Sequence, residues 1–459
     1  MRKNLVNHEG VCLYCPIMLE CVTKIRFGQK YGAHAWIEIE GILHGEEDVE
    51  KVYSINMQDT IMLKKKDKIL FSGVFVKTEL EKRGELYQVI MTGNSKSILL
   101  DLEKRQKSYQ KNTTFKEIFE EKIGNNGVIK MQPSMEKQEK KQLYVQYWET
   151  DWDFLKRIAS QENAQICPDI NVEKNSIIVG VPNGREITDK FARYELEKSI
   201  ENFLRSQADG QARIDKEYMT LKTKSYKNYK IGDRICFEKY HLVLAEVFMQ
   251  YTDGLLEYTY TWKHEKGMKC RKKYNKKIKG ASVDGKIIKV EKDRVKLHLS
   301  IDSSQSVSEA IFFPVAIGYT AEGSTGLYTA MDEGECVKLY FPSANEKDAY
   351  VRCVDKNDKE TSQHFSNPVS KCYGTLYGSS ICTTEDGVLI TSSKDEIYIK
   401  MGETEGIEIH STEDINIYSE KEIDIDCKKM KIKSEDKIIF QTKEDLLLVD
   451  ETIFMNPNR

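Results

Sequence analysis

The sequence predicts a mainly β protein with a small α+β insert and a repetitive C-terminal segment. Three observations lead to this class: short alternating segments lie on both sides of a helical stretch, an all-strand block begins at residue 280, and an apolar–polar–apolar pattern repeats from Val388. Alternation with a period of two is typical of strands with one covered face. The 459 residues have room for about three domains.

The composition excludes several classes. With 40% hydrophobic residues, the chain is too apolar for a disordered protein. Its 70 Lys and Arg against 73 Asp and Glu give a net charge of −3, which disfavours a general polyanion binder. The longest apolar runs, such as Leu446–Val449, are far shorter than the roughly 20 residues that a membrane-spanning helix needs.

The N-terminal sequence and the cysteines indicate the compartment. We recognise no apolar core of a secretory signal in the first residues, and the 11 scattered cysteines fit reduced thiols better than a disulfide framework. We therefore expect synthesis and assembly in the cytoplasm.

Residues 1–95 read as strands, for example at Met18–Arg26, Trp36–Gly41 and Leu86–Thr92. The spacing then changes and predicts helices over Ser97–Lys107 and Thr114–Lys122. Asn112 and Thr113 are candidate N-caps of the second of these helices.

A strand at Leu143–Tyr147 is followed by a third predicted helix. Thr150 or Asp151 can cap its first turn, where acidic side chains also meet the positive end of the helix dipole. Its buried face is predicted to consist of Phe154, Leu155 and Ile158.

Strands return after residue 166, including Ser176–Val181 and Ile235–Phe248. Residues 264–279 are strongly basic, and we interpret them as a solvated linker rather than a nucleic-acid site because Tyr274 is their one aromatic residue. Residues 280–355 hold four or five strands with Gly-rich turns, which suits a small barrel such as an OB-fold.

From Val388 the chain repeats pairs of apolar residues separated by one residue, and successive pairs begin 7 to 10 residues apart. A regular short period is typical of a stacked array. The eight pairs are Val388/Ile390, Ile397/Ile399, Ile407/Ile409, Ile415/Ile417, Ile423/Ile425, Met430/Ile432, Ile438/Phe440 and Leu446/Leu448.

Each unit offers only two apolar residues, which is too little burial to offset the entropy of ordering a single chain, about 1–2 kcal/mol per residue. Identical chains that share one apolar axis solve this, most simply as a threefold β-prism. The repeat has no heptad period, so it does not predict a coiled coil. A set of surface hairpins with accidental spacing is the alternative interpretation.

The predicted trimer axis contains Ile397, Ile399, Ile407, Ile409, Ile415, Ile417, Ile423, Ile425, Met430, Ile432, Ile438, Phe440, Leu446 and Leu448. Beyond them, Ile453, Phe454 and Met455 form an apolar end that needs covering, so we predict that another protein contacts it.

The order of these modules resembles the VgrG/phage late control D family, the hub-and-spike proteins of contractile injection systems. The segment Tyr147–Asp151 (YWETD) resembles the family's Tyr-x-Glu-Ser/Thr-Asp, and Phe154–Arg157 (FLKR) its Phe-Leu-x-Arg. The pair Glu162–Asn163 departs from the family's Glu-Gly, but Asn tolerates the same left-handed backbone. The barrel segment Met331–Pro342 is similar to the family's Gly-x-x-Val-x-Val-x-Phe strand.

Segments and resemblance together predict an ordered set of domains. These are a first tube-like β-barrel hub domain (1–95), an α/β insert (96–170), a second tube-like β-barrel hub domain with the basic linker (171–279), an OB-fold (280–357), a neck (358–387) and a needle that is a triple-stranded β-helix (388–459).

The resemblance implies a structural role: a homotrimer that caps the inner tube, nucleates assembly of baseplate and tube, and punctures a target envelope. The implied partners are the inner tube protein, baseplate proteins, effector cargo and a separate PAAR-like tip protein at Ile453, Phe454 and Met455. They belong to a particle that acts at or beyond the cell envelope. A spike-associated protein that binds carbohydrate or degrades peptidoglycan is the alternative.

We expect no enzyme and no cofactor. About 30 residues separate Val354 from Val388, and a hydrolase domain needs roughly 100. Cys12, Cys15 and Cys21, with His8, lack the second paired cluster of structural zinc sites. His410 has no neighbouring His with which to build a metal tip.

Overall fold

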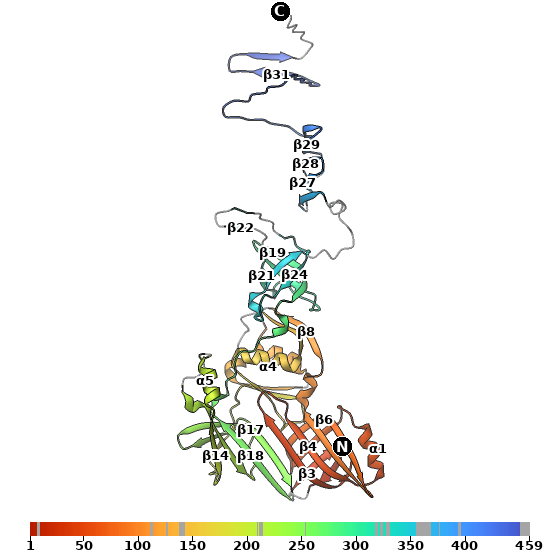
Figure 1. Ribbon diagram of the computed structural model, residues 1–459, viewed down its shortest axis with the longest axis vertical. Helices are drawn as coiled ribbons and strands as arrows, with labels where there is room; N and C mark the ends of the chain where they lie inside the picture. Colours follow the sequence, from red (N-terminus) through yellow and green to blue (C-terminus); the bar gives the residue numbers. More distant parts are fainter. Residues whose placement is uncertain are drawn as a thin grey trace, which may run out of the picture. The chain divides into compact units, whose positions relative to one another are not determined.

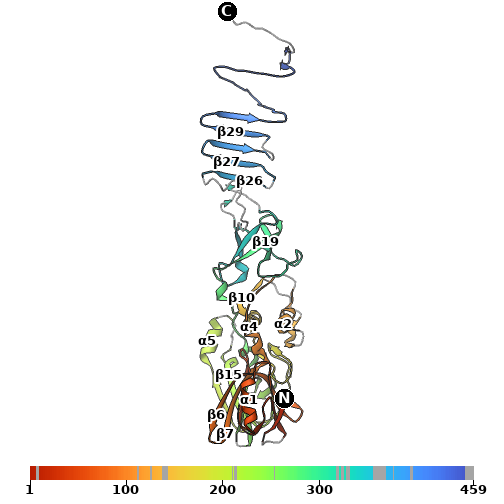
Figure 2. The same ribbon diagram turned by 90° about the vertical axis from the view of Figure 1, so that its right-hand side faces the viewer.

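The computed structural model describes residues 1–6, 10–110, 113–124, 127–136, 143–208, 210, 214–252, 254–316, 320–321, 325–326, 331–354, 369–375, 377–392 and 396–449. The chain divides into two compact units, Met1–Asn357 and Asp358–Arg459 (Figures 1 and 2). In the described residues, no helix is both long and apolar enough to cross a membrane. The mainly β class is confirmed.

A 13-stranded sheet forms the base of the first unit, and both predicted strand-rich hub regions contribute to it. In spatial order the strands are β1 (Arg2–Leu5), β2 (Val11–Cys15), β5 (Thr60–Lys65), β6 (Lys68–Arg83), β7 (Leu86–Ser95), β4 (Trp36–Leu43), β3 (Leu19–Lys30), β17 (Tyr240–Thr252), β18 (Leu255–Lys263), β15 (Met219–Ser225) and β14 (Tyr194–Lys198), while β16 (Arg234–Phe237) pairs with β17 and β13 (Glu186–Ile187) with β16.

The two regions meet where β3 pairs with β17, in the register Phe27 to Met249 and Ile25 to Tyr251. One apolar cluster runs across this junction and includes Leu13, Phe71, Tyr258 and Trp262. The connections between the strands of the large sheet contain the helices α1 (Glu46–Ser54) and α5 (Ile200–Ala208) and the 3₁₀ helices η2 (Asp215–Tyr218) and η3 (Glu265–Met268).

The insert packs around a second apolar cluster, and Figure 1 shows its helix α4 between the large sheet and the next barrel. Its elements are η1 (Lys96–Leu100), β8 (Lys104–Tyr109), α2 (Phe115–Ile123), β9 (Val128–Met131), α3 (Pro133–Glu136), β10 (Tyr144–Thr150), α4 (Asp151–Gln161), β11 (Ile166–Pro168) and β12 (Ser176–Val179).

Two helix predictions in the insert are confirmed and one is wrong. Thr114, not Thr113, caps α2 through a capping box with Glu117, and Asn112 lies outside the described residues. Thr150 caps α4 by accepting from the backbone of Asp153. The predicted helix over Ser97–Lys107 is instead η1 followed by β8, because pairing with β10 overrides the local helical spacing.

The segment from residue 280 forms the predicted OB-like barrel. Its sheet has the order β21 (Phe312–Pro314), β20 (Arg294–Leu299), β19 (Ser282–Glu291), β24 (Cys336–Tyr340) and β25 (Tyr350–Val354). A parallel bridge from Val315 to Val351 brings the two end strands together. Four short elements precede or interrupt these strands in the sequence: η4 (Lys276–Ile278), β22 (Thr320–Ala321), β23 (Thr325–Gly326) and η5 (Glu346–Asp348).

The second unit contains an antiparallel meander, visible as stacked strands in Figure 2. Its strands are β26 (Lys371–Gly374), β27 (Ser380–Thr384), β28 (Gly387–Thr391), β29 (Tyr398–Gly402) and β30 (Gly406–His410). A hairpin of β31 (Ile438–Gln441) and β32 (Leu446–Val449) follows. The meander therefore begins before the predicted needle boundary at Val388.

A disulfide joins Cys372 on β26 to Cys382 on β27, which are directly opposite in the sheet register. The expectation of reduced thiols throughout is therefore wrong for this pair. The spacing of the cysteines did not predict this disulfide, because only the hairpin register brings the two side chains together.

The disulfide predicts a local stability effect. Replacing both Cys372 and Cys382 with Ser is expected to destabilise the β26–β27 hairpin by about 2–3 kcal/mol, since the crosslink closes a short loop. Denaturant unfolding of the full chain with and without dithiothreitol measures this. Cys236→Ser, at an exposed free cysteine, is the control and should change nothing.

Candidate functional site

The meander places apolar residues of successive strands in rows on one of its faces. Ile381, Ile390, Ile399 and Ile409 are register partners from strand to strand. A second row joins Val388 to Met401 and Met401 to Ile407. Because alternate residues of a strand share a face, both rows lie on the same side of the sheet.

Within the described residues of the single chain, this apolar face is uncovered. Ile399 is 37%, Ile409 59% and Ile407 71% exposed. The opposite face carries the disulfide and charged side chains such as Lys400, which pairs with Glu405. A sheet with one polar face and one exposed apolar face indicates a missing partner.

Ile399, Ile407 and Ile409 of the predicted axis lie on this face, and the remaining axis residues fall into three groups. Ile397 lies just before β29 and has no partner in the meander register. The residue of β29 that pairs with Val388 is Met401, which the prediction did not include. The residues from Ile415 to Ile432 lie in a segment, 411–437, that is entirely described and forms no strand. Ile438, Phe440, Leu446 and Leu448 lie in the β31–β32 hairpin, and Ile453, Phe454 and Met455 lie outside the described residues.

A buried ionic cluster connects the insert to the OB-like barrel. The Arg157 guanidinium on α4 donates to Glu149 at 2.8 Å and to Glu346 of the barrel at 2.7 Å. It also donates to the carbonyl of Val145. The three ionic side chains are almost fully buried, and Arg157 is 3% exposed.

A β-bulge aims Glu149 into this cluster. The β10–β8 register shifts between Tyr147 and Glu149, and Trp148 takes a left-handed backbone with φ of 50° and stays exposed. An extra residue of this kind redirects the next side chain. Burial raises the pKa of Glu149, and the nearby Glu346 adds to the rise, although Arg157 opposes both.

The sequence analysis assigned no role to Arg157, although a signal was present. Arg157 lies one position from Ile158 and three from Phe154 on the predicted buried face of the helix. A charge at such a position requires ionic or hydrogen-bonding partners. Only the fold shows that one partner, Glu346, comes from the barrel nearly 200 residues later.

Further hydrogen bonds connect β8 to the barrel. The backbone and hydroxyl of Ser108 both donate to Asp302, and the Gln110 side chain donates to the carbonyl of Leu297. The side-chain oxygen Oε1 of Gln110 accepts a hydrogen bond from the backbone N–H of Ile311.

The basic segment 264–279 is fixed in place and is not a free linker. The backbone of Cys270 donates to Asn163, which itself has the left-handed φ expected of a Gly substitute. The backbone of Lys273 donates to Ser160, and the Asn275 amide donates to Tyr147. The segment thus follows the end of α4 and leads into the barrel.

One side-chain group has the composition of a hydrolase triad. His34 lies 2.8 Å from the Ser97 hydroxyl and 3.2 Å from the Asp101 carboxylate, and its ring packs on Trp152. Ser97 is only 1% exposed, and its hydroxyl also contacts Ser95. A nucleophile without access to substrate does not fit catalysis, so this group fits a structural connection between β3–β4 and η1.

The N-terminal cysteines lie apart in the sheet. Cys15 is buried beside Asn4, and burial raises the pKa of its thiol to about 12, which makes it unreactive. In the part of the chain that the structure describes, which omits His8, no three His, Cys, Asp or Glu side chains are grouped for metal binding.

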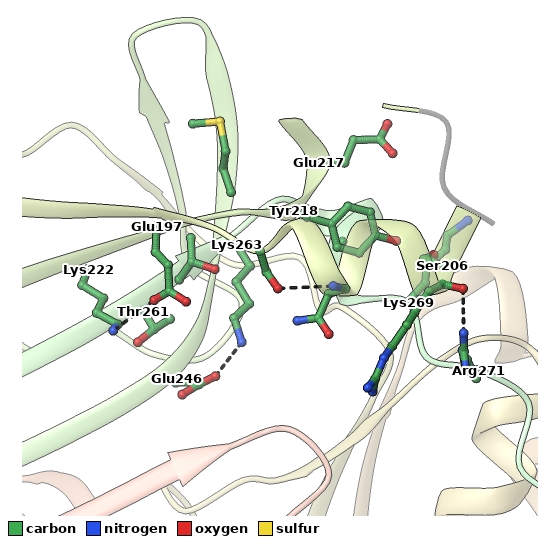
Figure 3. Close-up of a pocket in the computed structure, with 16 residues that line it drawn as sticks. Glu197, Ser206, Glu217, Tyr218, Lys222, Glu246, Thr261, Lys263, Lys269 and Arg271 are labelled. Atoms are coloured by element: carbon green, nitrogen blue, oxygen red, sulfur yellow. Dashed lines mark hydrogen bonds and ion pairs between the residues drawn. The ribbon is translucent and has the colours of Figure 1, made fainter. Parts of the chain in front are cut away.

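A cleft of about 540 Å³ lies between α5, β15, β18 and the basic segment (Figure 3). Its charges are largely neutralised within the wall: Lys263 pairs with Glu246 at 2.6 Å and Lys222 with Glu197 at 3.4 Å. The cleft is polar and lacks the apolar lining of typical small-molecule sites.

Several solved structures share this fold. A chain of the half-lidded Francisella PdpA-VgrG complex matches with a TM-score of 0.56 and 9% identity, over 85% of this chain and 83% of that chain. A chain of the lidless PdpA-VgrG complex matches with a TM-score of 0.54 and 10% identity, over 85% of this chain and 93% of that chain. The E. coli c3393 protein matches with a TM-score of 0.53 and 14% identity, over 74% of this chain and 98% of that chain. It is described as a type VI secretion component with structural similarity to the T4 bacteriophage tail proteins gp27 and gp5.

The chain therefore has the fold of VgrG-like hub-and-spike proteins, and the resemblance inferred from the sequence is confirmed at the level of the fold. A model of the Alg8 N-terminal domain matches residues 60–194, a segment that cuts through the large sheet and includes the insert. That match covers less than half of the chain and does not define its family. No curated protein matches the sequence.

The buried cluster predicts a large effect of Arg157→Met. The substitution leaves Glu149 and Glu346 buried without their counter-ion, which is expected to cost about 3–5 kcal/mol. Arg105→Met is the control, because Arg105 is 56% exposed where it pairs with Asp151 and should cost under about 1 kcal/mol. Urea unfolding followed by Trp fluorescence compares them, and equal midpoints would contradict the assigned role.

The raised pKa of Glu149 predicts a pH effect. Its folded pKa lies above the ordinary value of 4.5, so the folded chain holds this proton more tightly and loses stability as the pH rises above 4.5. Glu149→Gln removes this loss, and its stability should fall less than that of the wild type between pH 5 and pH 7. Denaturant midpoints at both pH values test this, and parallel curves would refute it.

Proposed function

We propose that this chain is the central hub and spike of a contractile injection system and that it works as a homotrimer. The observation that carries the proposal is the uncovered apolar face of the meander. Its two rows, through Ile390 and Ile399 and through Val388 and Met401, have no cover within the described chain. Three such faces around one axis cover one another.

The segment 411–437 supports the same arrangement. It continues the apolar pairs, its side chains are exposed, and it forms no strand within its own chain. Once its apolar pairs are buried, the backbone donors and acceptors of such a segment need partners in the protein. In a triple-stranded β-helix those partners come from the other two chains.

In this proposal, the fold of the first unit supplies the hub. The large sheets of three copies close the end of the inner tube, seed the baseplate, and pass the force of sheath contraction to the needle, which breaches the target envelope. The energy comes from the sheath, so the chain needs no bond chemistry. Inner tube protein, baseplate proteins and effector cargo are the expected partners.

A separate tip protein of the PAAR type belongs to the same proposal. Ile453, Phe454 and Met455 remain the predicted contact residues, because three copies of this apolar end would otherwise meet water. The assembled particle acts at or beyond the cell envelope, whereas its subunits are made in the cytoplasm.

A second candidate keeps the same trimer but gives the needle a carbohydrate-binding or peptidoglycan-degrading task. Release of soluble fragments from purified peptidoglycan by the full chain would favour it. The polar, ion-paired cleft and the buried Ser97 argue against hydrolysis at those two places.

Two neighbouring residues of β28 test the trimer. Ile390→Asp puts a carboxylate on the apolar face and is expected to lower the mass in solution from about 159 kDa, three times 53.1 kDa, to that of a single chain. Burying an unpaired carboxylate costs several kcal/mol per chain. Light scattering coupled to size exclusion gives the mass.

Leu389→Asp is the matched control, because Leu389 is next in the same strand and points to the opposite face. It should leave a mass of about 159 kDa. A wild-type chain that is already monomeric, or two variants that dissociate alike, would overturn the proposed axis.

A further inference from the structure

A second cleft in the first unit collects positive charge. It has a volume of about 560 Å³, which is typical of small-molecule sites. The turn between β5 and β6, the connection from β15 to β16 and Tyr258 of β18 line it. We call it the lysine cleft, after its basic lining residues, which are Lys65, Lys66, Lys68, Arg185, Lys227 and Lys230.

The charge of the lysine cleft is only partly neutralised. Arg185 pairs with Asp233 at 2.7 Å, and Lys227 pairs with Asp189 at 2.7 Å. The other exposed lysines differ: within the described part of the chain, Lys66, Lys68 and Lys230 form no ion pair. Among the described lining residues, Asp67 is the only acidic one. This cleft therefore carries an excess of positive charge, unlike the ion-paired cleft beside α5.

Hydrogen bonds hold the β5–β6 wall of the lysine cleft in place. The backbone of Lys66 is left-handed, with φ of 52°, and its N–H donates to the carbonyl of Gly10 at 2.7 Å. The side-chain amide of Asn171 donates to the carbonyls of Ile69 and Leu70 at 3.0 and 3.2 Å. The turn that presents the lysines is thus fixed from both sides.

The opposite wall is fixed in a similar way. The Tyr260 hydroxyl donates to the carbonyl of Lys227 at 2.6 Å and accepts from the backbone N–H of Tyr229 at 3.0 Å. The backbone N–H of Lys230 donates to the Asp233 carboxylate at 3.0 Å. Walls that are ordered before binding reduce the entropy that a ligand has to overcome.

A buried hydroxyl without a partner lies in the lining of this cleft. Tyr258 and Tyr260 are two residues apart on β18 and share a face, and their rings lie 5.6 Å apart and nearly parallel. The Tyr260 hydroxyl reaches the connection after β15, but the Tyr258 hydroxyl makes no hydrogen bond among the described residues, although the side chain is fully buried.

The Tyr258 hydroxyl is available as a donor. Burial raises the pKa of Tyr258 above its ordinary value, so the hydroxyl keeps its proton at neutral pH. A buried donor without an acceptor is unfavourable, and an anionic oxygen at the floor of the cleft supplies the acceptor.

We propose that the lysine cleft binds a small anion with two or more phosphate groups, held by the unpaired lysines and the Tyr258 hydroxyl. Lys ammonium groups bind phosphate as point charges. Lys66 and Lys68 lie on one wall and Lys230 on the other, which favours a ligand with several charged groups over a single carboxylate. This binding activity goes beyond the proposed role as hub and spike, and it uses residues of one chain only.

Isothermal titration calorimetry of the full-length chain tests the proposal with two probes, sodium tripolyphosphate and ATP. Both carry three linked phosphate groups, and only ATP carries a base, which the 66% exposed ring of Tyr226 can stack on. We expect both to bind, more weakly as the salt concentration rises. Tighter binding of ATP would identify a nucleotide as the ligand, and equal binding would identify the phosphate chain alone.

Lys230→Gln removes one unpaired charge and should weaken the binding of both probes about tenfold, which corresponds to about 1.4 kcal/mol. Lys292→Gln is the matched control, because Lys292 is an exposed lysine in the β19–β20 turn, away from the cleft. It should leave both affinities unchanged.

Tyr258→Phe removes only the hydroxyl and should weaken binding about fivefold. It should not lower the midpoint of urea unfolding, because the hydroxyl has no partner to lose. Tyr53→Phe, at a residue of α1 that is 77% exposed, is the control for the loss of a hydroxyl.

Two results would overturn the proposal: neither probe binds at millimolar concentration, or both bind equally well to the wild type, Lys230→Gln and Tyr258→Phe. The second result would show that the anions bind elsewhere on the chain. The mass in solution reports on the proposed trimer separately, so the failure of one proposal is distinguished from the failure of the other.

Discussion

The constraint on which the rest depends is an apolar surface that the described residues leave uncovered. In the meander, the rows through Ile390 and Ile399 and through Val388 and Met401 run along one face of the sheet. Burial of apolar area is the main favourable term in folding, at about 25 cal/mol per Å². In the proposed trimer, the other chains supply the missing layer, which is why the proposed function is inseparable from assembly.

The first unit solves a different problem, the joining of three modules without a flexible connection. The large sheet is continuous through the pairing of β3 with β17. Arg157 then connects the insert to the barrel through two buried carboxylates, and the basic segment 264–279 is held along α4 by hydrogen bonds. Buried ionic contacts add little net stability, but they tolerate few alternative geometries. The proposed role as a hub that passes on force requires such a fixed geometry between the modules.

The sequence predicted those features that depend on local pattern. The α4 cap at Thr150 follows from propensity within one turn, and the shared face of Ile390, Ile399 and Ile409 follows from a period of two. Features that depend on distant pairing were missed. The stretch 97–107 has helical spacing yet forms β8, because β10 supplies its hydrogen bonds, and Met401 replaces Ile397 because the hairpin fixes the register. The partner of Arg157 and the Cys372–Cys382 disulfide also require the fold. The domain boundaries remain predictions.

The repeat also determines the symmetry of the proposed contact between meanders. In the meander the exposed residues repeat on every strand, so equivalent faces can meet around an axis. In the proposed trimer, three identical faces around a common axis cover one another in a closed ring. A polar substitution on that face, such as Ile390→Asp, acts three times in one assembly.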